Sequence, residues 1–278
     1  MLAITNLTHY IDYSSVATFL KSLFIHLFFL QNYLPHNPNG PTWSLAVEEH
    51  FYILLPLLLI GLVSLARRNN KHWAVYIPAT TGIVVMICLT LRIINYLFFM
   101  DSNDFMQTHL RIDALLIGVF IQYLFITKSK IIDCIRENKY WFLCISFLLL
   151  LPAFWFGRSS AFMFTFGFLF LSIGYGLLLI LVYTGLIERW ESNYIVTAIS
   201  NIGVWSYNIY LWQFFLFFLP IPFMPQINVL TTTYIHNEIL LVIAHATIFI
   251  ALSVVVGWLI TVLIESPFLR LRDKLIPR

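Results

Sequence analysis

The chain has 278 residues, of which 60% are hydrophobic and only 10% are charged, and its formal net charge is +3. A soluble domain would carry roughly 25% charged residues, so the composition excludes an ordinary soluble protein. The basic residues lie in separate clusters and form no continuous stripe, which argues against nucleic-acid binding. Because the apolar runs are continuous and do not alternate, we expect an all-α, polytopic helical membrane protein in the lipid bilayer.

Eight apolar runs are candidates for membrane-spanning helices, each of which needs about 20 largely apolar residues. We expect these spans at residues 13–32, 44–65, 74–99, 111–127, 140–156, 162–186, 203–220 and 238–264. The first span is the weakest, because Lys21 and His26 interrupt it. No soluble domain, long linker or internal repeat separates the runs, so residues 1–278 are expected to form a single membrane-embedded domain.

The basic residues predict the orientation of these spans, because Lys and Arg gather in cytoplasmic loops. Twelve of the sixteen Lys and Arg residues lie after the second, fourth and sixth spans or in the carboxy-terminal tail. The opposite loops hold one basic residue, Arg158. Eight spans with both termini in the cytoplasm satisfy this distribution.

This topology brings charged residues to the outer ends of three neighbouring spans. Glu48 and Glu49 open the second span, Arg92 lies about two turns from the outer end of the third, and Arg111 and Asp113 open the fourth. Charged groups in a membrane are costly, so they tend to be functional or to pair with opposite charges. We therefore expect an outward-facing polar pocket at this depth.

The segment from Trp43 to Tyr52 is the most informative part of the sequence. Ser44, Glu48 and Tyr52 are spaced four residues apart and share one helix face, and Trp43 suits a membrane interface. We predict that Glu48 is catalytic, as a general acid, base or charge partner, and that Trp43, Ser44 and Tyr52 bind substrate. The alternative interpretation is a Glu–Arg ion pair that only fixes helix packing.

Arg92 and Arg111 are also predicted to bind substrate, because an arginine fork suits a phosphate, a carboxylate or an oxyanion. The alternative for each is a side chain that snorkels to the interface. Glu265, which closes the last span before Ser266 and Pro267, is expected to pair with nearby arginines. No cluster of His, Cys and Asp has metal-ligand spacing, so neither a metal site nor a bound cofactor is expected.

Several motifs together resemble the acyltransferase-3 family of integral-membrane acyltransferases, which modify cell-envelope sugars in bacteria. The matching motifs follow the family's order and lie at residues 30–35 (LQNYLP), 43–56 (WSL, then Glu48, Phe51, Tyr52 and Pro56), 111–118 (RIDALLIG), 206–212 (SYNIYLW) and 265–267 (ESP). The motif at residues 43–56, around Trp43, is fairly specific, and the other motifs are supportive. The resemblance covers the chain from about residue 13 to residue 272.

The resemblance implies an O-acetyltransferase-like enzyme of the bacterial inner membrane. It implies acyl-CoA, acetyl-CoA in particular, as the donor substrate reached from the cytoplasm, and an envelope polysaccharide or lipid-linked sugar as the acceptor outside. The family has about ten spans, and its first span carries an arginine and the histidine taken as catalytic. Nothing before residue 13 supplies these, so the chain is expected to lack the family's first two helices. Gln213 also stands where the family commonly has histidine.

Two other functions stay open at this point. The chain could be an inactive remnant or one half of a split acyltransferase, in which case it would be poorly active by itself. It could also be a transporter of a polar or anionic substrate, although that class predicts inverted repeats and broken helices that the sequence does not show.

Overall fold

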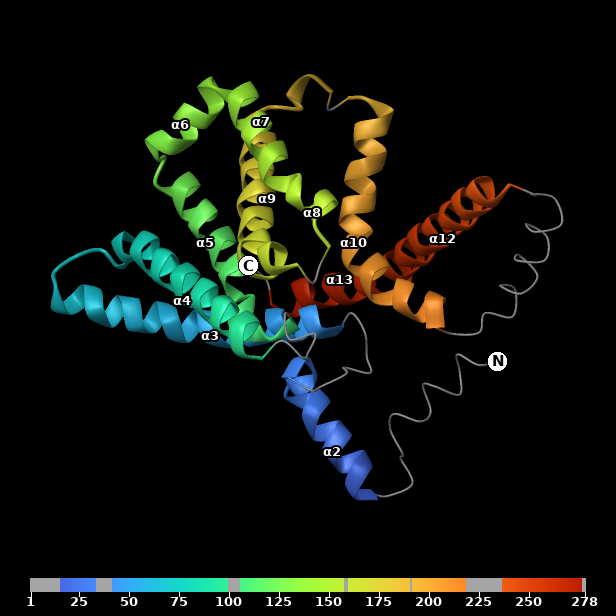
Figure 1. Ribbon diagram of the computed structural model, residues 1–278, viewed down its shortest axis with the longest axis horizontal. Coiled ribbons are helices and arrows are strands. Elements are labelled where there is room, and N and C mark those ends of the chain that lie inside the picture. The colour runs from blue at the N-terminus through green and yellow to red at the C-terminus, as the bar shows by residue number, and fades with distance from the viewer. Residues whose placement is uncertain are drawn as a thin grey trace. The chain divides into compact units, whose positions relative to one another are not determined.

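The computed structural model describes residues 16–33, 42–99, 106–157, 160–190, 192–218 and 237–276, and these residues form helices and connecting turns without a strand. The chain divides into two compact units, Met1–Glu188 and Arg189–Arg278, which we describe one at a time (Figure 1). The predicted all-helical class is confirmed for the described part of the chain. Leu34 and Pro35 of the LQNYLP motif and residues 219–236 lie outside it.

The first unit begins with α2 (Val16–Leu27) and the short 3-10 helix η1 (Leu30–Tyr33). The long helix α3 (Thr42–Arg68) follows and contains the predicted span 44–65. It ends with Arg67 and Arg68, whose positive charges interact favourably with the negative, carboxy-terminal end of the helix dipole.

The next helices bring the third predicted span against the fourth. The turn η2 (Trp73–Tyr76) leads into α4 (Ile77–Phe98), whose second residue is a proline, as is common at helix starts. The 3-10 turn η4 (Thr108–Leu110) precedes α5 (Ile112–Ile126), and α4 packs along α5. The charged residues that the sequence singled out lie near the start of α3, in the last two turns of α4 and at the start of α5.

One predicted inter-span loop is instead a helix. Residues 128–139 contain α6 (Lys130–Glu137), which lies at 91° to α5. The Ser129 hydroxyl caps its start by accepting from the Ile131 N–H, and Ile132 and Ile135 are buried in the core of the unit. A capped helix forms here because two isoleucines spaced three residues apart reach one apolar surface while the charged side chains stay outside.

The remaining helices of this unit are packed closely at glycines. They are α7 (Lys139–Leu150), α8 (Pro152–Trp155), the π-helical turn η5 (Met163–Gly167) and α9 (Phe168–Tyr183). A Cβ on Gly174 would lie 2.9 Å from Leu150 Cδ2, and the buried Ser146 hydroxyl donates to the Gly174 carbonyl at 2.8 Å. Small residues therefore allow α7 and α9 to approach, as at many membrane helix contacts.

The second unit contains α10 (Tyr194–Phe218), α12 (Glu238–Ile260), the π-helical turn η7 (Thr261–Glu265) and α13 (Ser266–Leu275), with the 3-10 turn η6 (Glu188–Trp190) at the boundary between the units. Gly257 of α12 is pressed against Ile209 of α10: a Cβ at 257 would lie 2.3 Å from Ile209 Cγ1 and 2.9 Å from its backbone nitrogen. Only a glycine allows this approach.

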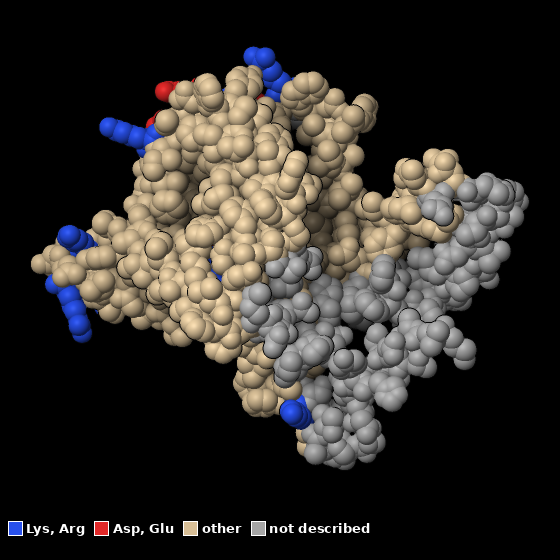
Figure 2. Space-filling view, in the orientation of Figure 1, with Lys and Arg blue, Asp and Glu red and all other residues tan. Residues whose placement is uncertain are grey.

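Four stretches of the described residues are long and apolar enough to cross a membrane: Thr42–Arg68, Trp73–Phe98, Met163–Tyr183 and Ile239–Leu275. The bent pair α5 and α6 would add a fifth. Many large apolar side chains are exposed, and most charged ones in view lie near α6 and at the turn between α3 and α4, with another over α2 (Figure 2). This surface suits lipid, whereas the eight-span count and the cytoplasmic termini stay predictions.

Candidate functional site

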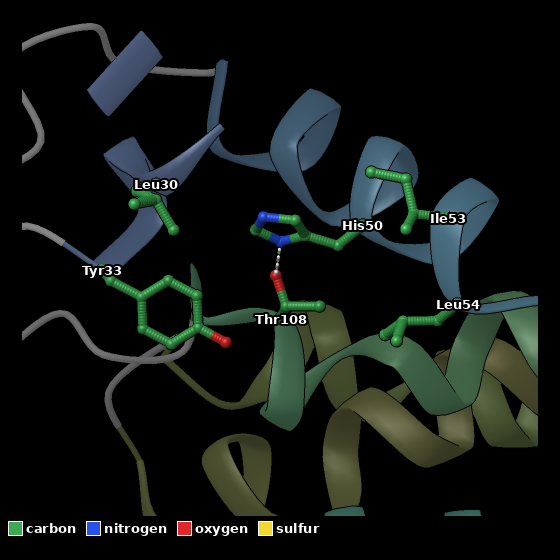
Figure 3. A pocket seen from close by; sticks show the side chains of 6 residues that line it. All are labelled: Leu30, Tyr33, His50, Ile53, Leu54 and Thr108. Atoms are coloured by element: carbon green, nitrogen blue, oxygen red, sulfur yellow. Dashed lines mark hydrogen bonds between the residues drawn. The ribbon is translucent and has the colours of Figure 1, made fainter. Parts of the chain in front are cut away.

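A pocket of about 480 Å³ lies between η1, the third and fourth turns of α3, and η4. Figure 3 shows its lining residues, which are Leu30, Tyr33, His50, Ile53, Leu54 and Thr108. Its volume falls within the roughly 300–1,000 Å³ of small-molecule sites, and a mostly apolar wall with a few polar groups is typical of them. Segments far apart in the sequence therefore meet in one concave site.

The shortest polar contact of this pocket joins α3 to η4. His50 Nδ1 lies 2.7 Å from the Thr108 hydroxyl oxygen, and His50 Nε2 lies 3.3 Å from the Phe28 carbonyl oxygen (Figure 3 shows the Thr108 contact). Both nitrogens of the imidazole ring thus have an oxygen within hydrogen-bond reach. The ring is held in one orientation at the pocket wall.

Asn32 of η1 fixes Thr108 from the other side. The Asn32 side chain is 4% exposed, and its amide is satisfied when its oxygen accepts from the Thr108 N–H at 3.2 Å and from the Thr108 hydroxyl at 2.8 Å. In that orientation its nitrogen donates to the Phe29 carbonyl at 3.3 Å. A buried amide of this kind is costly unless it is hydrogen-bonded. The Asn32 side chain therefore ties η1 to η4.

Tyr33 completes the polar edge of the pocket. Its hydroxyl lies 3.3 Å from His109 Nδ1, and its ring stacks on the His109 ring at a centroid distance of 5.7 Å. The centre of the His50 ring lies 6.4 Å from that of Tyr33. The Tyr33 ring therefore neighbours two imidazoles.

A second cluster, of aromatic rings around Arg111, lies at the amino-terminal ends of α3, α5 and α9. The Arg111 guanidinium carbon is 3.6 Å from the centre of the Phe168 ring and 5.3 Å from that of Trp43. Contacts of a guanidinium with ring faces are attractive and fix its orientation. Two predicted substrate-binding residues, Trp43 and Arg111, are thus brought together, with Phe168 as a third partner.

Arg92 is placed differently. Its guanidinium pairs with the Asp113 carboxylate of α5, and both side chains are about 2% exposed. The expectation that opposite charges pair at this depth is confirmed for Arg92 and Asp113. Among the described residues, however, no ion pair joins Glu48 to an arginine.

The other predicted residues lie outside the pocket wall. Ser44 and Glu48 are half-buried on α3, whereas Tyr52 is 60% exposed. None of them is among the side chains that line the pocket. Their predicted roles stay predictions.

Sequence reasoning missed the contact between His50 and Thr108. His50 follows Glu49 directly, and the spacing to Ile53 and Leu54 would have placed these three side chains on one helix face. The predicted site lies on the face of Ser44, Glu48 and Tyr52 instead, and a contact to a residue 58 positions later leaves no local signal. In the described ranges, no group of three or more His, Cys, Asp or Glu side chains could hold a metal ion.

In the second unit, two further motifs meet. The Asn208 amide of α10 donates to the Thr261 hydroxyl and to the Glu265 carboxylate of η7, which corrects the expectation that Glu265 pairs with arginines. A π-helical turn often marks a functional position. Here it aims Thr261 and Glu265 at the same amide group.

Comparison with known proteins gives one group of relatives. Proteins named "putative O-acetyltransferase" from three strains of Staphylococcus aureus (COL, MSSA476 and MRSA252) are each 28% identical to the chain over 187 residues. The matched part is 64% of this chain and 29% of each relative, so it spans less than a third of their length. No family model and no solved structure matches the chain.

Proposed function

We propose that the chain transfers an acyl group, most simply acetyl, from acyl-CoA to a hydroxyl of a cell-envelope carbohydrate. The acceptor is an envelope polysaccharide or a lipid-linked sugar, and the protein acts as a multi-pass protein of the bacterial inner membrane. The distant similarity to proteins named O-acetyltransferases supports the reaction class. The apolar helices support the membrane location.

The observation that carries the proposal is the packing of Arg111 against Trp43 and Phe168. Transfer of an acyl group passes through a tetrahedral intermediate that carries an oxyanion, and a cation with a fixed orientation stabilises that charge. Arg111 meets this requirement because two ring faces hold its guanidinium at the ends of three helices.

The other predicted residues have supporting roles in this proposal. Glu48, with Ser44 and Tyr52 on its helix face, orients the acceptor by accepting hydrogen bonds from its hydroxyls. Arg92 acts in the same region through its ion pair with Asp113, which fixes the start of α5 two residues after Arg111. The acceptor oxygen bonds to the acyl carbon, the carbon–sulfur bond breaks, and coenzyme A leaves as its thiol.

The test is an acyl-transfer assay with the purified full chain in lipid nanodiscs. Acetyl-CoA is the donor, a soluble envelope oligosaccharide is the acceptor, and release of the CoA thiol and acetylation of the sugar are both measured. Arg111→Met should lower kcat/KM by roughly 10²–10³-fold, the loss expected for an oxyanion-stabilising group. The control is Arg67→Met, an exposed arginine at the far end of α3, which should leave the rate unchanged.

Two results would overturn the proposal. One is a wild-type chain that releases no thiol beyond the acceptor-free background. The other is an Arg111→Met variant that transfers acetyl at the wild-type rate. Uptake of an anionic solute into proteoliposomes without acyl-CoA would support the transporter function instead.

A further inference from the structure

The last helix of the second unit, α13, has few neighbours within its unit. It follows α12 through the π-helical turn η7, which is the element it chiefly packs against (Figure 1). None of its ten residues is buried, and they include four charged side chains and four large apolar ones. Because both kinds of side chain are left open on one short helix, α13 suits a partner that is apolar at one depth and charged at another.

The apolar side chains of α13 form a stripe along one face. Phe268, Leu271 and Leu275 follow one another at i, i+3 and i+7, and they are 69%, 52% and 73% exposed. At roughly 100° per residue, the three lie within about 60° of one another around the helix. We call this surface the α13 stripe. In a soluble domain such a stripe would face a core, and the described residues of the second unit leave it open.

Cations border the α13 stripe on both sides. At the same rotation per residue, Lys274 lies roughly 95° from the middle of the stripe on one side and Arg272 roughly 65° on the other. Arg270 and Lys274 are four residues apart, so their like charges repel across one turn, and neither forms an ion pair with a described residue. The carboxylate of α13, Asp273, already pairs with Arg272 at 2.8 Å. An external anion would therefore relieve the repulsion between Arg270 and Lys274.

The length of the helix places α13 at a membrane surface. Ile239–Leu275 is one helical stretch of 37 residues, which at 1.5 Å per residue is about 55 Å long. The hydrocarbon core of a bilayer is about 30 Å thick. The 23 residues of α12 cross that core by themselves, at about 35 Å. α13 therefore begins at the level of the lipid head groups.

Resting on the membrane location above and not on the acyl transfer, we propose that α13 is an interfacial helix. Its stripe inserts among the lipid chains of one leaflet, and its cations bind the phosphate groups of anionic lipids. A basic amphipathic helix that adjoins a span is suited to such a surface, because its apolar face is buried in lipid while its cations attract the negative head groups. The long side chains at the edges of the stripe can reach those head groups while their stems stay in the apolar layer.

The junction between α12 and α13 allows this orientation. Pro267 lacks a backbone N–H and follows the π-helical turn η7, and prolines and π-helical turns are both common sites of helix kinks. The Asn208 amide holds the turn to α10 through Thr261 and Glu265. α13 can therefore tilt toward the membrane surface about an anchored turn.

Site-directed spin labelling of the full chain in lipid nanodiscs measures the depth of each face of α13. The three native cysteines are replaced (Cys88→Ala, Cys134→Ser and Cys144→Ser), and single cysteines are then introduced at exposed positions of α13. In nanodiscs that contain anionic phosphatidylglycerol, labels on the α13 stripe should be accessible to oxygen, which dissolves in lipid, and shielded from a water-soluble nickel chelate. We expect these labels roughly 5–10 Å into the boundary between head groups and acyl chains, whereas a label at Asp273 should contact the chelate.

A second measurement uses the chain with its native cysteines and tests the charge. Hydrogen exchange of residues 266–275 should be slower in nanodiscs with phosphatidylglycerol than in nanodiscs of neutral phosphatidylcholine. The double variant Arg270→Gln with Lys274→Gln should lose that difference. The control removes two exposed cations of α6, by Lys130→Gln with Arg136→Gln, and should keep the difference.

Three results would overturn the inference. Contact with nickel on every face of α13 would place the helix in water, and a stripe shielded from both oxygen and nickel would mean that protein covers it. Equal hydrogen exchange in the two lipids would remove the anionic partner. A label at Ile250, an exposed residue in the middle of α12, checks the membrane location: contact with nickel there would overturn that location as well, whereas an oxygen-accessible label there confines a failure to α13.

Discussion

Replacing Arg92 by methionine should destabilise the first unit strongly, because it leaves the Asp113 carboxylate buried without its partner. Both side chains are about 2% exposed, and Arg92 Nε has no hydrogen-bond partner among the described residues, so the pair depends on its direct contact. The same reasoning applies to Asp113→Leu, which strands the guanidinium. Replacing Arg92 and Asp113 together leaves no unpaired buried charge, although the attraction between the two charges is lost as well.

The magnitude follows from the burial of the pair. Two unit charges about 4 Å apart attract by about 4 kcal/mol at an effective dielectric constant of 20, and removing one partner of a buried pair costs about 3–5 kcal/mol. Each single variant should therefore lose about 3–5 kcal/mol of unfolding free energy. The double variant of Arg92 and Asp113 should stay within about 1 kcal/mol of the parent, because well-packed apolar residues replace such pairs with little loss.

The assay is unfolding by sodium dodecyl sulfate in mixed micelles, followed by circular dichroism, for the parent, both single variants and the double variant. The exposed pair of Arg272 and Asp273 is the matched control, and Arg272→Met should change stability by no more than about 1 kcal/mol. A single variant as stable as the parent would refute the reasoning, and so would a double variant whose loss equals the sum of the two singles. Acyl transfer by a stable double variant would show that the charges of Arg92 and Asp113 serve stability and are not needed for transfer, whereas a stable but inactive one would support the prediction that Arg92 binds substrate.

Two further predictions concern the contact between α10 and α12. Gly257→Ala should lower the unfolding free energy by about 1–3 kcal/mol, because the added Cβ would lie 2.3 Å from Ile209 Cγ1. The control is Gly203→Ala, whose Cβ would meet nothing within 4 Å and which should be neutral or slightly stabilising. Equal melting temperatures for the two variants would contradict the close approach of α10 and α12. Asn208→Leu should destabilise the chain by about 1–3 kcal/mol, because the part-buried Glu265 carboxylate loses the amide that donates to it, and the pair Asn208→Leu with Glu265→Leu should recover part of this loss in the same measurement.

The agreement between the expected spans and the helices comes from local chemistry. The apolar run 44–65 lies inside α3, and the run 74–99 matches η2 and α4 together to within one residue at each end. Helices in a membrane must satisfy their backbone groups internally, so a long apolar run leaves the chain little choice. Residues 128–139 were harder to predict, because the eight residues of α6 become helical through a Ser129 cap and through two isoleucines that need a core to bury them.

The candidate site shows where such local reasoning stops. The sequence places Glu48, Arg92 and Arg111 at a similar depth, since depth depends only on position along each span. Which charges meet depends on how each helix is rotated about its axis, and that is fixed by packing contacts such as those at Gly174 and Gly176. Arg92 therefore pairs with Asp113 and not with a glutamate of α3.

The sequence by itself determined that this protein is helical and apolar enough for a membrane, and it located the polar ends of the helices, because both properties are carried by residues close together in the chain. Only the tertiary structure decided which side chains share a site. It brought Trp43 to Arg111 and Phe168, and it brought His50 to Thr108. The physical reason is that a contact between residues tens of positions apart is selected by the packing of whole helices, which no single segment encodes.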